Sequence, residues 1–178
     1  MPLVEKRYAE ALVGLAEQAG AIDDYQKDFQ AVVTQFNELQ EFRLFMLDPE
    51  VRTETKKDLI MKIFQGNVRP DVLNFILLLL DKGRIKYLSE MLSEFIKVAD
   101  KKRSILNIRV ISAAPLNDAQ IAGIKAKYIR LYDATAAKVE TEIDRNLIGG
   151  LKVIIGDKVM DGSLKGRLEE LKQLMVQG

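Results

Sequence analysis

PDVLNFILLLLDKG, residues 70–83, contains the longest apolar run of the chain. Asn74 is the only polar residue within residues 72–80, so a helix formed here would be apolar on all sides. Pro70 suits the first turn of such a helix, and Gly83 suits its end. A helix of this kind belongs in the middle of a helical bundle, or it lines a groove that receives a helix from a partner. Periodicity alone does not choose between these two interpretations.

Apolar residues recur at helical spacing on both sides of this segment. Ile22, Phe29 and Phe36 belong to one such stripe, and charged or amide side chains fill the opposite face of the same helix. Gly20 is a plausible helix end, and Thr53 can cap the N-terminus of a later helix. The pattern predicts six helices in the first part of the chain, over residues 4–19, 22–39, 42–47, 53–64, 70–80 and 85–103.

The apolar period changes near residue 105. Leu106, Ile108 and Val110 alternate with polar residues, which is typical of a strand with one buried face. Asn117 opens a capping-box pattern before the next helical stripe. The expected order is a strand over 106–110, a helix over 117–132, strands over 138–144, 151–155 and 159–160, and a last helix that begins at Ser163.

These patterns predict a mainly α protein with a small α+β part. An N-terminal six-helix bundle, residues 1–105, is followed by a small C-terminal α/β domain, residues 106–178. No internal repeat interrupts either part.

The composition restricts the chemistry that the chain can perform. Apolar residues make up 48% of the sequence and charged residues 30%, which suits a packed core under a polar surface. There is no cysteine and no histidine, which excludes a Cys/His zinc site, a disulfide and a Ser-His-Asp triad. The formal net charge of +1 argues against a nucleic-acid binder. The run over residues 75–80 is too short to span a bilayer.

The glycine-rich segment 156–167 offers the strongest alternative function. A helix that begins after such a turn can bind phosphate, which would favour a small nucleotide-using enzyme. The pattern GxxxxGK[ST] is absent, because Ser163 directly follows Gly162. A hairpin turn followed by a Ser-capped helix explains the same residues. Glu140 and Glu142 lie on the exposed face of a predicted strand and do not indicate a catalytic carboxylate pair.

Four segments stand out in register along the chain: RYAEAL at residues 7–12, DKGRI at 81–85, VISAAPL at 110–116 and the region 144–171. With these segments the chain resembles the δ subunit of bacterial F-type ATP synthases, whose mitochondrial relative is the oligomycin-sensitivity-conferring protein. The resemblance covers essentially the whole chain.

The resemblance implies a non-catalytic stator subunit, part of the peripheral stalk. Such a subunit ties the catalytic head to membrane-anchored b subunits, so that the head does not turn with the rotor during proton-driven ATP synthesis. The helical domain, residues 1–105, would bind the N-terminal helix of an α subunit in a groove between the first and fifth helices. Carried over by position, one wall comprises Tyr8, Ala11, Leu12 and Leu15, and the other comprises Asn74, Leu77 and Leu78.

The resemblance implies a second contact for the C-terminal domain, residues 106–178, which would bind the C-terminal ends of the paired b subunits. Its expected structural turns are formed by Gly149, Gly150, Gly156, Asp161, Gly162 and Ser163. No catalytic residue, metal or cofactor is expected, nor any nucleic-acid partner or direct membrane insertion. The expected location is peripheral, on the cytoplasmic face of the bacterial cell membrane, within the ATP synthase complex.

Overall fold

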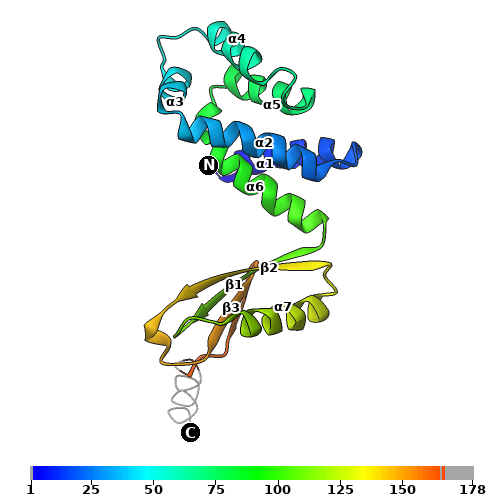
Figure 1. Cartoon of the computed structure of the whole chain (residues 1–178), viewed down its shortest axis with the longest axis vertical. Helices are drawn as coiled ribbons and strands as arrows, with labels where there is room; N and C mark the ends of the chain where they lie inside the picture. Colours follow the sequence, from blue (N-terminus) through cyan, green and yellow to red (C-terminus); the bar gives the residue numbers. More distant parts are fainter. Residues whose placement is uncertain (1, 165, 167–178) are drawn as a thin grey trace. The chain divides into compact units, whose positions relative to one another are not determined.

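The computed structural model describes residues 2–164 and 166, which divide into two compact units (Figure 1). Unit 1 ends at Ala99 and unit 2 begins at Asp100. The six-helix bundle expected from the sequence is confirmed. Its elements are α1 (Pro2–Gln18), α2 (Ile22–Glu38), α3 (Gln40–Leu47), α4 (Thr53–Phe64), α5 (Pro70–Asp81), the 3₁₀ helix η1 (Ile85–Tyr87) and α6 (Leu88–Lys102), whose last turn belongs to unit 2.

The core of unit 1 is built around α5. Phe29 of α2 packs edge-to-face against Phe75 of α5 at 5.5 Å and against Phe95 of α6 at 6.0 Å between ring centroids. Burial of each such side chain stabilises the fold by roughly 1.5–3 kcal/mol. The apolar character of α5 is therefore largely explained by the core, but Leu78 remains 42% exposed. The buried residues of α5 are Val72, Leu73, Phe75, Ile76, Leu79 and Leu80.

The connection between α5 and α6 differs from the expected continuous helix over residues 85–103. Gly83 adopts φ +63°, and the Arg84 N–H donates to the Leu79 carbonyl at 2.8 Å. This left-handed glycine reverses the chain at the end of α5. The following turn is the tighter 3₁₀ form, which buries Ile85 before the α-helical hydrogen bonds begin at Leu88.

Unit 2 contains a four-stranded sheet in the order β2-β1-β3-β4. The first pair is parallel and the other two pairs are antiparallel. The connection between the parallel strands contains α7, as parallel pairing requires. This small α/β unit confirms the second half of the predicted architecture. The elements are β1 (Ile105–Ser112), α7 (Asp118–Tyr132), β2 (Ala136–Ile143), η2 (Arg145–Leu147), β3 (Leu151–Ile155) and β4 (Lys158–Asp161).

Helix α7 covers one face of this sheet and forms a second, smaller core. Tyr128 of α7 packs with Ile108 and Val110 of β1 and with Val153 of β3, all of which are buried. Asn117 closes the N-terminus of α7 by the capping box that the sequence predicts: its side chain accepts from the Gln120 N–H at 2.8 Å, and the Gln120 side chain accepts from the Asn117 N–H at 2.9 Å.

The last turn of α6 is joined to the sheet by a buried carboxylate. Asp100 is fully buried, and the Lys138 ammonium on β2 donates to its two oxygens at 2.7 and 2.8 Å. The Asn107 amide on β1 donates to the same carboxylate at 3.1 Å, and Arg103 does so at 3.4 Å. Asp100 is the first residue of unit 2, and the residues it contacts belong to the same unit. The division therefore falls inside α6, between Ala99 and Asp100, rather than after residue 105.

Candidate functional site

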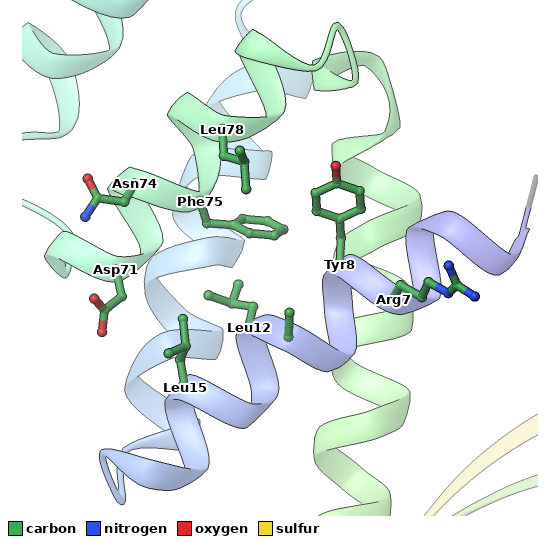
Figure 2. Close-up of a pocket in the computed structure, with 9 residues that line it drawn as sticks. Arg7, Tyr8, Leu12, Leu15, Asp71, Asn74, Phe75 and Leu78 are labelled. Atoms are coloured by element: carbon green, nitrogen blue, oxygen red, sulfur yellow. The ribbon is translucent and has the colours of Figure 1, made fainter.

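A groove between α1 and α5 is the main candidate site of unit 1 (Figure 2). Its volume is about 480 Å³. Leu12, 1% exposed, and Phe75, 7% exposed, form an apolar floor. Leu15 and Leu78 are 45% and 42% exposed at the rim. The lining residues are Arg7, Tyr8, Ala11, Leu12 and Leu15 from α1, and Asp71, Asn74, Phe75 and Leu78 from α5.

Aromatic contacts fix one end of this groove. The Tyr8 ring packs edge-to-face against Phe75 at 6.3 Å between centroids. The Arg84 guanidinium lies 5.2 Å from the centroid of the same Tyr8 ring, in a cation–π contact. Figure 2 shows Tyr8 opposite Leu78 at this end, with Arg7 next to it on α1. The end is therefore apolar at its floor and basic at its margin.

A polar network fixes the other end, where α5 begins. The Tyr25 hydroxyl donates to the Asp71 carboxylate, and this hydrogen bond, together with burial, raises the pKa of Tyr25. The Asp28 carboxylate accepts from the Arg69 N–H at 2.9 Å, and the Arg69 side chain pairs with Asp24. The Arg69 guanidinium also lies 5.6 Å from the Tyr25 ring centroid. These contacts tie the first turn of α5 to α2 and so position one wall of the groove.

The groove brings together all but one of the residues that the sequence assigned to its walls. Tyr8, Ala11, Leu12, Leu15, Asn74 and Leu78 line it. The exception is Leu77, which is half-buried and packs against the core of unit 1. Whether the lining residues contact a partner stays a prediction.

Helix geometry explains why Leu77 is absent and which residues the sequence analysis missed. Asp71, Asn74, Phe75 and Leu78 recur at spacings of three and four along α5 and share one face, whereas Leu77 is rotated ~100° from Leu78. The spacing could thus have identified Asp71 and Phe75. Arg7 carries no comparable signal, because an exposed arginine beside an apolar stripe is common on helices.

Two hydrogen bonds join the predicted turns of unit 2 to each other, and we call this joined region the closure. The Gly162 N–H donates to the Leu151 carbonyl at 2.9 Å, and the Leu164 N–H donates to the Gly149 carbonyl at 2.9 Å. Gly150 adopts φ +82° beneath this pair of bonds. The turn between β3 and β4 contains Gly156, at φ +57°.

Ser163 caps the helix that follows this closure. Its side chain is fully buried, and its Oγ accepts from the Gly166 N–H at 3.0 Å. The Ser163 N–H donates to Asp161 Oδ1 at 2.9 Å, and hydrogen bonds from Ser163 lower the pKa of the Asp161 carboxyl. The Ser163 N–H and the Gly166 N–H are thus both taken up by side chains of this segment, which favours the turn and cap over the phosphate-binding alternative. The later part of the predicted helix, including Leu168, Leu171 and Met175, lies outside the described residues.

Comparison with known proteins identifies the family. The family model described as ATP synthase delta (OSCP) subunit matches residues 4–175. The chain belongs to this family. ATP synthase subunit delta of Acetivibrio thermocellus is 43% identical over 177 residues, which cover 99% of each chain. ATP synthase subunit delta of Ruminiclostridium cellulolyticum is 39% identical over 175 residues, which cover 98% of this chain and 99% of the relative.

A solved structure shares the fold over nearly the full length. One chain of the cryo-EM structure of the Toxoplasma gondii mitochondrial ATP synthase hexamer matches with a TM-score of 0.72 and 21% identity, covering 97% of both chains. Because the identity is low, this likeness shows the fold alone.

Membership of the family makes this chain a structural, non-catalytic stator subunit of F-type ATP synthase. None of the helices within residues 2–164 and 166 has the length and apolar character needed to cross a bilayer. The same residues contain no group of three or more Asp or Glu side chains arranged to hold a metal ion.

Proposed function

We propose that the groove between α1 and α5 binds the N-terminal helix of the ATP synthase α subunit, and that unit 2 binds the C-terminal ends of the b subunits. The chain then links the catalytic head to the membrane-anchored stalk, at the cytoplasmic face of the bacterial cell membrane. The link resists rotation of the head while protons drive the rotor.

The apolar floor of the groove carries this proposal. Leu12 and Phe75 are buried beneath an open channel, while Leu15 and Leu78 remain exposed on its two sides. An amphipathic helix fits such a channel by placing side chains at i, i+3, i+4 and i+7 between the two walls. The core explains the buried side of α5, but it leaves Leu78 exposed, and a partner helix supplies the missing apolar contact.

The expected strength of the groove contact is moderate. Burial of four large apolar side chains of a ligand helix contributes about 6–12 kcal/mol before costs. Association costs ~4–15 kcal/mol in lost freedom of motion, so a single groove holds its ligand only modestly. A second contact through unit 2 makes retention in the complex cooperative, because the tethered partner rebinds at high effective concentration. A stator under load benefits from this arrangement.

Replacement of Leu78 by aspartate is expected to weaken binding of the α-subunit helix by about 100-fold, because a charge would be placed against the apolar face of the ligand. The measurement is calorimetric titration of the full-length chain with a peptide of about 20 residues from the N-terminus of the α subunit of the same organism. Wild-type protein should bind one peptide per chain.

Leu44→Asp is the matched control for this titration. Leu44 lies on α3 outside the groove and is 60% exposed, so the same substitution adds the same charge to the surface. Its affinity for the peptide should stay within about twofold of wild type. Equal weakening by both variants, or absence of binding to wild-type protein that is folded by circular dichroism, would refute the groove as the binding site.

A further inference from the structure

Asp161 and Gly162 form the only aspartate–glycine pair of the sequence, and no asparagine is followed by glycine. The amide nitrogen of a glycine that follows an aspartate can attack the side-chain carboxyl carbon and close a succinimide ring. Glycine favours this attack because it has no side chain to hinder the approach and its backbone reaches the required conformations. Asp161 is exposed at the end of β4, so burial does not shield its carboxyl group. By sequence, this pair is the aspartate position most prone to the reaction.

The closure restrains both reacting groups. The Gly162 N–H, which contains the attacking nitrogen, donates to the Leu151 carbonyl at 2.9 Å. The Oδ1 atom of Asp161 accepts from the Ser163 N–H at 2.9 Å, which holds the carboxylate in place. Asp161 is also the last residue of β4 and pairs with Lys152 of β3, so its backbone stays extended. Attack requires the amide to leave its acceptor and the carboxyl group to turn toward it, and the closure opposes both movements.

Two further features of the closed form oppose the reaction. Ring closure expels a carboxyl oxygen as water, which requires the protonated carboxyl group. Hydrogen bonds from the side chain and the backbone N–H of Ser163 lower the pKa of Asp161, so the closed form contains less of this protonated group at neutral pH. A Cβ at Gly166 would lie 3.0 Å from the Asp161 Cγ, so the backbone of Gly166 covers one side of the carbon that the nitrogen must reach.

We propose that Asp161 is a site of aspartate isomerisation and that opening of the closure sets its rate. The Gly162 nitrogen bonds to Asp161 Cγ, and the carboxyl OH leaves with the amide hydrogen as one water molecule. A water molecule then opens the succinimide. Addition at Cγ restores aspartate, whereas addition at the main-chain carbonyl carbon breaks its bond to nitrogen and leaves isoaspartate. The sum is an isomerisation that needs no oxidant, reductant or cofactor. The proposal goes beyond the function proposed above and does not depend on it.

Isomerisation removes the closure that prevented it. An isoaspartate at position 161 routes the main chain through Cγ and lengthens it by one methylene group before Gly162. The closure depends on the Gly162 and Leu164 N–H groups meeting their carbonyl partners, each at 2.9 Å. The longer chain cannot satisfy both hydrogen bonds at once. A chain that isomerises during an opening therefore stays open.

Peptide mapping with electron-transfer fragmentation distinguishes isoaspartate from aspartate at each position and tests the proposal. The full-length chain and a synthetic peptide of residues 157–166 are incubated in the same buffer at neutral pH. Isoaspartate at position 161 should accumulate at least about tenfold more slowly in the folded chain than in the peptide. Gly150→Ala places a Cβ 2.4 Å from the Gly162 carbonyl oxygen and should raise the rate in the full-length chain at least about fivefold.

Gly123→Ala is the matched control, because it makes the same substitution in α7 with open space around the new Cβ. Its rate should stay within about twofold of wild type. Equal rates in the folded wild-type chain and the peptide would overturn the proposal, and this comparison stays decisive if Gly150→Ala unfolds unit 2. Equal rates for Gly150→Ala and Gly123→Ala, or a peptide without isoaspartate at position 161, would also overturn it.

Hydrogen exchange gives an independent readout of the lost closure. Wild-type chains that carry isoaspartate at position 161 are separated from unmodified chains after incubation. The amides of Gly162 and Leu164 should exchange at least about tenfold faster in the isoaspartate fraction, while amides of α2 in unit 1 should exchange at unchanged rates. Equal exchange of Gly162 and Leu164 in the two fractions would contradict the proposed loss of the closure.

Discussion

Replacement of Gly150 by alanine is expected to destabilise unit 2 by at least about 3 kcal/mol. A Cβ at this position would lie 2.4 Å from the Gly162 carbonyl oxygen and 2.9 Å from the Ser163 Cα. These are backbone atoms that the hydrogen bonds of the closure hold in place, so they cannot move aside separately. The φ of +82° adds a conformational cost for any residue with a side chain. The measurement is hydrogen exchange of backbone amides in β1 and β3.

Two other glycines provide controls for this effect. Gly156 has φ +57° with open space around its Cβ position, so Gly156→Ala isolates the conformational cost, about 1–2 kcal/mol. Gly123 lies within α7, again with open space, and Gly123→Ala should be neutral or slightly stabilising. Amides of α2, in unit 1, serve as the internal reference. If Gly150→Ala lowered the stability of unit 2 no more than Gly156→Ala does, the closure would not be tightly packed.

Replacement of Lys138 by methionine is expected to destabilise unit 2 by about 2–4 kcal/mol. Asp100 is fully buried and receives two of its contacts from the Lys138 ammonium. Without that cation, the partners of the carboxylate among the described residues are the Asn107 amide and the more distant Arg103 guanidinium. A buried charge that loses its partner costs more than the pair itself contributes, because the charge stays out of water. Urea unfolding measures the loss of stability. Hydrogen exchange of backbone amides in β1 and β2 shows that the loss lies in unit 2.

The matched variants separate charge from packing at this site. Lys138→Arg keeps the cation and should cost less than about 1 kcal/mol. The double variant Asp100→Asn with Lys138→Met removes both charges, and it should be more stable than Lys138→Met alone. If the double variant were less stable by the sum of the two single losses, the two residues would act independently, and the account of a coupled pair would be wrong.

Local patterns predicted most of the architecture. The apolar run of α5, the capping box at Asn117 and the alternation in β1 each depend on neighbours a few residues away, so the sequence shows them directly. The contacts of Asp100 could not be predicted in this way. Its main partner, Lys138, is 38 residues away, and each of the two residues taken singly looks like ordinary surface charge.

The candidate groove could also be predicted only in part from the sequence. The resemblance to the family indicated which two helices form it, but it assigned Leu77 to a wall although that side chain packs against the core. The helical spacing of Asp71, Phe75 and Leu78 specifies the open face more directly. The closure in unit 2 could be predicted in part, because the sequence marks Gly149 and Gly150 as a tight turn. The structure adds that a Cβ at Gly150 would meet backbone atoms, whereas a Cβ at Gly149 would meet the end of the Leu164 side chain.

ATP-driven proton pumping tests the central claim, that this chain ties the catalytic head to the membrane. Membrane vesicles from cells that lack the chain should fail to pump protons when ATP is added, although the catalytic heads still hydrolyse ATP. Pumping should return when wild-type protein or Leu44→Asp is added together with heads, and should remain below about a tenth of that level with Leu78→Asp. Full pumping without the chain, or full recovery with Leu78→Asp, would contradict the account.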